Sequence, residues 1–118
     1  MAKKIRHIAI LANDNAALAE FYQKTFGMRE VANEGDGGAI YVSDGYINLA
    51  LIAARGRPEG IFHFGFEVDD LATTAKAAVA EGGKAPVTVP ADGRFNEAFI
   101  KDPVGTRVDL SEAGWKTA

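Results

Sequence analysis

The stretch Phe62-His63-Phe64-Gly65-Phe66-Glu67-Val68 decides the fold, because it alternates large apolar residues with small or polar ones. Side chains on a β-strand point alternately to the two faces of the sheet, so this pattern predicts a strand with one apolar and one polar face. The apolar face is expected to pack on helices. His63, Gly65 and Glu67 share the other face, which should line a cavity or meet water.

The two halves of the chain repeat one pattern. His7-Ile8-Ala9-Ile10 matches His63-Phe64-Gly65-Phe66 at an offset of 63 − 7 = 56, and Ile47-Asn48-Leu49 matches Val108-Asp109-Leu110 at an offset of 109 − 48 = 61. The five-residue difference fits one longer loop in the second half. Repetition of a supersecondary unit is strong evidence about architecture.

Each half has the order βαβββ. The first half is expected to hold a helix over 16–26 and strands over 5–11, 28–32, 39–43 and 46–52. The second half is expected to hold a helix over 71–80 and strands over 61–68, 86–89, 97–101 and 107–111. The sequence therefore predicts an α+β domain spanning 1–118, with modules 1–54 and 60–118 that form one curved mixed sheet and helices on its outer face. Three consecutive strands after each helix argue against a ferredoxin-like βαββαβ order.

Composition narrows the classes of function. The 118 residues carry a formal net charge of −3 and no cysteine, which argues against nucleic-acid binding and excludes disulfides, thiolate nucleophiles and cysteine-based zinc sites. No apolar run reaches the length of a membrane span. The basic start is not followed by a signal-type apolar segment, so a cytoplasmic protein is expected. The tail from Glu112 is expected to be loosely held, with Trp115 as a candidate anchor.

Four polar side chains are predicted to project from the same side of the sheet: His7, Asn48, His63 and Asp109. Neutral imidazoles bind Fe, Mn, Ni, Co or Zn, and a carboxylate adds charge and an oxygen ligand. Two histidines and one carboxylate leave open positions for water and substrate, as a catalytic metal requires. We therefore predict one divalent metal ion bound by His7, His63 and Asp109, with Asn48 as a weak ligand or hydrogen-bonding partner.

Three segments of the chain resemble the vicinal oxygen chelate superfamily, which includes glyoxalase I, methylmalonyl-CoA epimerase, extradiol dioxygenases and bleomycin-resistance proteins. They are His7-Ile-Ala-Ile with Ala19-Glu-Phe-Tyr-Gln-Lys-Thr-Phe-Gly27, His63-Phe-Gly-Phe-Glu-Val-Asp-Asp-Leu71, and Phe99-Ile-Lys-Asp-Pro-Val-Gly-Thr-Arg-Val-Asp-Leu110. The resemblance implies paired modules forming a cup, with a divalent metal at its floor and usually a homodimer. It puts the family's metal histidines on His7 and His63 and its final-strand glutamate on Asp109.

Two residues depart from the family pattern. Asp109 is one methylene shorter than the usual glutamate, which puts its coordination in question. Asn48 stands where glyoxalase I and the epimerase have Glu or Gln, and a neutral amide cannot act as a general base. Glu67 is a substitute catalytic candidate, with a solvated or salt-bridged surface carboxylate as the alternative. Asp109 could instead pair with Arg107.

Three functions fit these residues. The first is a metal-dependent lyase or isomerase acting on an oxygen-chelating small molecule. The second is an iron(II) extradiol-type dioxygenase, although no histidine remains for acid–base work after His7 and His63. The third is a non-catalytic binding protein of the bleomycin-resistance type, which generally lacks the full ligand set.

Overall fold

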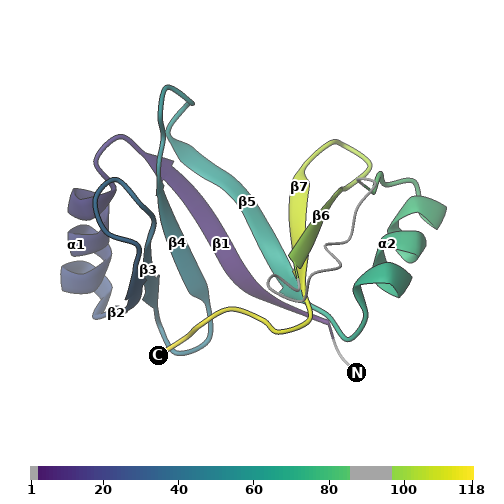
Figure 1. Cartoon of the computed structure of the whole chain (residues 1–118), viewed down its shortest axis with the longest axis horizontal. Coiled ribbons are helices and arrows are strands. Elements are labelled where there is room, and N and C mark those ends of the chain that lie inside the picture. Colours follow the sequence, from purple (N-terminus) through teal and green to yellow (C-terminus); the bar gives the residue numbers. More distant parts are fainter. Residues whose placement is uncertain (1–2, 86–96) are drawn as a thin grey trace. The chain divides into compact units, whose positions relative to one another are not determined.

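The computed structural model describes residues 3–85 and 97–118, and two helices accompany the strands in this part of the chain (Figure 1). The elements are β1 (Lys4–Ala12), α1 (Asn15–Phe26), β2 (Arg29–Asn33), β3 (Ile40–Ser43), β4 (Asn48–Ala53), β5 (Gly60–Glu67), α2 (Leu71–Ala80), β6 (Glu97–Lys101) and β7 (Arg107–Ser111). Every expected helix and strand within the described residues is present. The strand expected over 86–89 lies outside them.

The chain divides into two compact units, which we describe separately. The amino-terminal unit comprises His7–Phe62 with Lys116–Ala118, and the carboxy-terminal unit comprises His63–Trp115 with Met1–Arg6. The carboxyl-terminal residues of the chain thus belong to the unit built from its first half.

The strands of the amino-terminal unit follow the order β2-β3-β4-β1. β3 is antiparallel to both β2 and β4, whereas β1 runs parallel to β4 with His7 opposite Asn48. A parallel pair needs a long crossover, and α1, β2 and β3 supply it. The register places the first histidine beside the asparagine that sequence repetition singled out.

Helix α1 begins and ends as its sequence predicts. The side chain of Asp14 accepts a hydrogen bond from the backbone N–H of Ala17, and Gly27 closes the helix in the left-handed conformation at φ 70°. The helix buries Ala19 against one face of the sheet, where the core cluster is completed by Ile40, Val42, Leu49 and Leu51. Ile8 and Ile10 of β1 pack on the same cluster, so His7 and Ala9 point to the opposite face.

The strands of the carboxy-terminal unit follow the order β5-β7-β6, with β5 parallel to β7 and β6 antiparallel to it. Asp70 caps α2 by accepting a hydrogen bond from the backbone N–H of Thr73. The core of this unit consists of Val68, Leu71, Val108 and Leu110, with Phe64, Phe66, Ala98 and Ile100 packed against it. The face expected to be apolar is therefore the face that meets α2.

Both units thus combine a parallel pair, an antiparallel neighbour and one helix, which confirms the predicted α+β class with a mixed sheet. Among the described residues, no helix is long and apolar enough to cross a membrane.

Candidate metal centre

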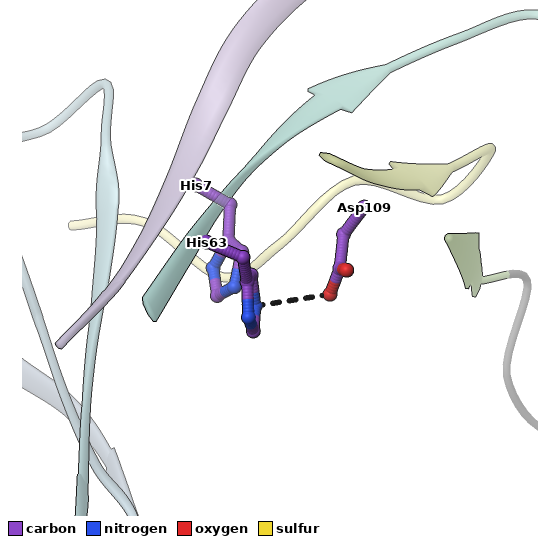
Figure 2. A group of neighbouring side chains, drawn as sticks. All are labelled: His7, His63 and Asp109. Carbon is purple, nitrogen blue, oxygen red and sulfur yellow. Dashed lines mark ion pairs between the residues drawn. The ribbon is translucent and has the colours of Figure 1, made fainter. Parts of the chain in front are cut away.

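A buried ion pair joins the two predicted ligands of the carboxy-terminal unit. His63 Nε2 on β5 lies 3.0 Å from Asp109 Oδ2 on β7, and each residue is only 6% exposed (Figure 2). The other carboxylate oxygen, Oδ1, accepts a hydrogen bond of 2.8 Å from Arg107 Nε. The guanidinium of Arg107 in turn lies 4.4 Å from the ring centroid of Phe99. Asp109 is therefore held at both oxygens.

The pairing register explains how Asp109 reaches His63. In the amino-terminal unit His7 lies directly opposite Asn48, but in the carboxy-terminal unit Asp109 lies opposite Gly65. The expected equivalence of Asn48 and Asp109 is thus wrong by two residues along the strand. Side chains two residues apart on a strand point to the same face. Asp109 therefore still shares a face with His63, as predicted, although the register differs.

The surroundings of Asp109 favour its ionised form. Burial alone is the largest influence and raises the pKa of this carboxyl group. The hydrogen bonds from His63 and Arg107, together with their charges, outweigh burial and hold the pKa of Asp109 below its usual value. The site therefore presents an anionic oxygen, which is the form that binds a metal ion.

His7 has a different partner in the amino-terminal unit. Its Nδ1 atom lies 2.9 Å from Asn48 Oδ1, and the two residues are 4% and 1% exposed. Asn48 Nδ2 donates a hydrogen bond of 2.8 Å to the backbone carbonyl of Lys116. Both side chains are therefore buried and hydrogen-bonded on the face opposite the helix.

Glu67, the substitute catalytic candidate, is the last residue of β5. Its carboxylate is 3.6 Å from the guanidinium of Arg6, and its side chain is 43% exposed. The Glu67 carboxylate also lies against the backbone of Gly114, where even a Cβ atom would collide with it. Glu67 therefore has the salt-bridged surroundings that the sequence left open as an alternative to catalysis.

His7, His63 and Asp109 are candidate metal ligands, and all three are buried (Figure 2). Each offers one ligand atom, a ring nitrogen of the histidines or a carboxylate oxygen of Asp109. Adjacent ligands of one cation, each bound at about 2.1 Å, lie about 3 Å apart, which is the His63–Asp109 spacing. Two imidazoles and one carboxylate are also a donor set for Fe, Mn, Co, Ni or Zn, so the residues fit the predicted metal.

Trp115, the candidate anchor of the tail, does contact a strand, whereas the sequence did not reveal the contact that Lys116 makes. The Trp115 ring lies so close to Gly65 that a Cβ atom at this position would approach it to 2.7 Å, and the Lys116 carbonyl reaches Asn48. One signal was available. Glycine inside a strand often marks a close approach by another group, and Gly65 is such a glycine.

A family model of the Glyoxalase/Bleomycin resistance protein/Dioxygenase superfamily matches residues 4–110. The chain belongs to this superfamily. A comparison with curated proteins gave no match.

Three solved structures resemble most or all of the chain. A hypothetical protein from Bacillus halodurans C-125 has a TM-score of 0.77 at 17% identity, covering 100% of this chain and 99% of its own. A methylmalonyl-CoA epimerase in complex with methylmalonyl-CoA has a TM-score of 0.72 at 22% identity, covering 100% of both chains. The epimerase from Mycobacterium tuberculosis has a TM-score of 0.68 at 20% identity, covering 90% of this chain and 85% of its own. These likenesses confirm the fold.

Proposed function

We propose that this protein is a divalent-metal-dependent isomerase or lyase whose small-molecule substrate chelates the metal through oxygen. The observation that supports it most is the buried pair of His63 and Asp109, 3.0 Å apart, together with the third buried candidate ligand, His7. Superfamily membership supports an enzyme. The fold shared with methylmalonyl-CoA epimerases favours isomerisation over the other reactions of the superfamily.

In this proposal the protein residues hold the cation and fix its charge. His7 and His63 would bind as neutral imidazoles, and Asp109 would supply one carboxylate oxygen. Arg107 already occupies Oδ1 of Asp109, so Oδ2, which faces His63, is the oxygen available to the cation. The bound metal would act as a Lewis acid toward a negatively charged oxygen that develops on the substrate.

An isomerisation next to a carbonyl also needs a group that moves a proton. The amide of Asn48 cannot do this, and its bonds to His7 and to the Lys116 carbonyl suit a positioning role. Glu67 is the carboxylate on the same strand face as His63, and we propose it for proton transfer. Its carboxylate lies 3.6 Å from the guanidinium of Arg6, which would hold it in place.

The same ligands support a second candidate, an iron(II) dioxygenase. Two histidines and one carboxylate on one face are the donor set of non-haem iron(II) oxygenases. The chain has two histidines in all, and both would be ligands in this reaction. Other side chains would then have to transfer protons to or from a catechol. Oxygen consumption with catechols under iron(II) would favour this candidate over an isomerase.

Metal binding to the whole protein tests the proposal. Protein purified without chelator is analysed for metals, stripped, and titrated calorimetrically with Mn²⁺, Co²⁺, Ni²⁺, Zn²⁺ and, without oxygen, Fe²⁺. We expect one bound ion per chain, and we expect His63→Gln and Asp109→Asn to weaken binding at least about tenfold. Asp36→Asn, which removes an exposed loop carboxylate, is the matched control. Failure of all five ions to bind refutes the proposal.

The reaction itself is tested with the metal that binds best. Carbonyl compounds and thioesters with an acidic α-hydrogen, methylmalonyl-CoA among them, are incubated in D₂O with the loaded enzyme. Metal-dependent exchange of the α-hydrogen would support isomerisation, and Glu67→Gln should suppress it. Binding of such compounds without any exchange or cleavage would favour a non-catalytic binding protein.

The assembly state of the protein is a related proposal. The rings of Phe21 and Phe26 on α1 are 52% and 66% exposed, an arrangement that suits burial against another protein surface. We propose a homodimer, as is usual for small members of the superfamily. Light scattering that gives the mass of one chain would contradict it.

A further inference from the structure

We propose that the backbone carbonyl of Lys116 positions the first metal histidine: it sets the orientation of the Asn48 amide and thereby the proton position on His7. The carboxyl-terminal segment would then be part of the site and not a passive tail. Its consequence for metal binding rests on the proposed function, but its effect on His7 does not.

Three polar groups form a chain in the amino-terminal unit. Asn48 Nδ2 donates to the Lys116 carbonyl at 2.8 Å, and Asn48 Oδ1 lies 2.9 Å from His7 Nδ1. The two side chains are buried, so water competes little for these bonds. Asn48 is thus the link between the carboxyl-terminal segment and the imidazole.

The chemistry of these groups allows one arrangement. A backbone carbonyl can only accept, so the NH₂ group of Asn48 must face Lys116 and its oxygen must face His7. The Asn48 oxygen also only accepts, so Nδ1 of His7 must carry the proton. The neutral ring then has its lone pair on Nε2, which is the nitrogen that a metal would take. Without the Lys116 carbonyl the amide could turn over, and the preference between the two tautomers would be lost.

Packing holds the segment that delivers this carbonyl. The backbone N–H of Gly114 donates to Ser111 Oγ at 2.9 Å, which forms a tight turn after β7. The ring of Trp115, the residue before Lys116, packs onto Gly65. By contrast, the Lys116 residue is exposed, so its side chain is not what the site uses.

Two truncations and one substitution separate the carbonyl from the rest of the segment. A chain ending at Trp115 lacks the Lys116 carbonyl, whereas a chain ending at Thr117 keeps it and serves as the matched control. Lys116→Ala keeps the carbonyl and removes only the side chain. Circular dichroism and thermal unfolding check that each variant is folded.

Nitrogen-15 NMR of the histidine rings reads the tautomer directly in metal-free protein, at a pH where the rings are neutral. His7→Gln assigns the signals, because the chain has only two histidines. We expect the Nδ1–H form of His7 in the full chain, in the chain ending at Thr117 and in Lys116→Ala. The chain ending at Trp115 should show a mixture of tautomers. An unchanged Nδ1–H form there, or an Nε2–H form in the full chain, overturns the inference.

Asn48→Leu in the full chain covers the case in which the shorter chain does not fold. This variant removes the link and leaves the segment intact, so His7 should again lose its Nδ1–H preference. A retained preference overturns the inference.

A cobalt titration measures the consequence of the Lys116 carbonyl for metal binding. If the proposed function holds, the chain ending at Trp115 should bind Co²⁺ about 10- to 100-fold more weakly than the chain ending at Thr117. Equal affinities overturn the inference. Full chain that binds no metal at all refutes the proposed function instead, and the NMR result then decides the inference alone.

Discussion

Asp109 Oδ2 lies 3.0 Å from His63 Nε2, and its other oxygen is held by Arg107. This relationship gives one carboxylate two roles. In the metal-free protein it is the anionic centre of a buried network, and in the proposed metal-bound protein it is a ligand. Because breaking a buried ion pair leaves a charge without compensation, neutralising Asp109 should destabilise the protein. The role in stability and the role in metal binding can be measured separately.

Asp109→Asn should destabilise the metal-free protein. The amide keeps the shape of the side chain but loses the negative charge. That charge strengthens the hydrogen bonds that the Asp109 oxygens accept from His63 and Arg107. Hydrogen bonds to charged groups contribute about 1.5–3 kcal/mol each, so a loss of about 2 kcal/mol in the free energy of unfolding is expected. Denaturant unfolding with chelator present measures it, and Asp36→Asn is the control. An unchanged midpoint would show that the pair contributes nothing to the fold.

Arg107→Lys should weaken metal binding although it keeps the positive charge. An ammonium group lacks the planar guanidinium that bonds Asp109 Oδ1 while lying over the ring of Phe99. Loss of such an outer-shell partner costs about tenfold or more in metal affinity. Calorimetric titration of stripped protein measures it, with Arg29→Lys as an exposed control. Equal affinity in the two variants would mean that the orientation of Asp109 does not depend on Arg107.

Most of the fold could be predicted because its local signals agree. Alternation along 62–68 identified the strand face that meets α2, and Asp14 and Gly27 marked the ends of α1. The predicted bounds differ from the observed ones by two residues at most. Such signals act within a few residues along the chain, so a single sequence contains them. The fold class follows from the order of elements that they define.

The sequence predicted which residues form the candidate site, but not which groups those residues contact. Alternation along a strand gives the face of a side chain, and it correctly put His63 and Asp109 on one face. Alternation does not give the register between paired strands. For this reason the predicted equivalence of Asn48 and Asp109 was wrong. The contact of Asn48 with Lys116 joins residues far apart in the sequence through a backbone atom. No pattern of side chains could have indicated that contact.

Asp70→Asn should make the stability of the protein depend less on pH in the acid range. The bond from the Thr73 N–H to the Asp70 carboxylate is the main reason that its pKa lies below its usual value. A lowered pKa in the folded state stabilises the protein above the pKa of the unfolded chain, about 3.9, and this contribution disappears as the pH falls through the folded value.

Thermal midpoints measured across the acid range test this prediction. Asparagine still caps a helix, so Asp70→Asn should be close to the parent at low pH and fall slightly below it at neutral pH. Asp70→Ala should be less stable at every pH, because it loses the cap as well. The pKa of Asp44 is also lowered, by hydrogen bonds from the backbone N–H groups of Ile47 and Tyr46, but Asp44 is present in all three proteins, so the difference between them isolates Asp70. A parallel profile for parent and Asp70→Asn would contradict the prediction.

Gly65→Ala should destabilise the protein mainly through contact with Trp115, although the methyl group would also lie 3.2 Å from the backbone oxygen of Asp109. The added methyl group would lie 2.7 Å from the Trp115 ring, on the ring edge farthest from the backbone. Overpacking of this kind typically costs about 1–3 kcal/mol. Trp115 is the only tryptophan, so its fluorescence reports both the displaced ring and the unfolding transition. Trp115→Phe removes those ring atoms, and in that background, followed by circular dichroism, Gly65→Ala should cost much less. An equal cost in both backgrounds would mean that the methyl group disturbs β5 itself, and that Trp115 does not pack on Gly65 in solution.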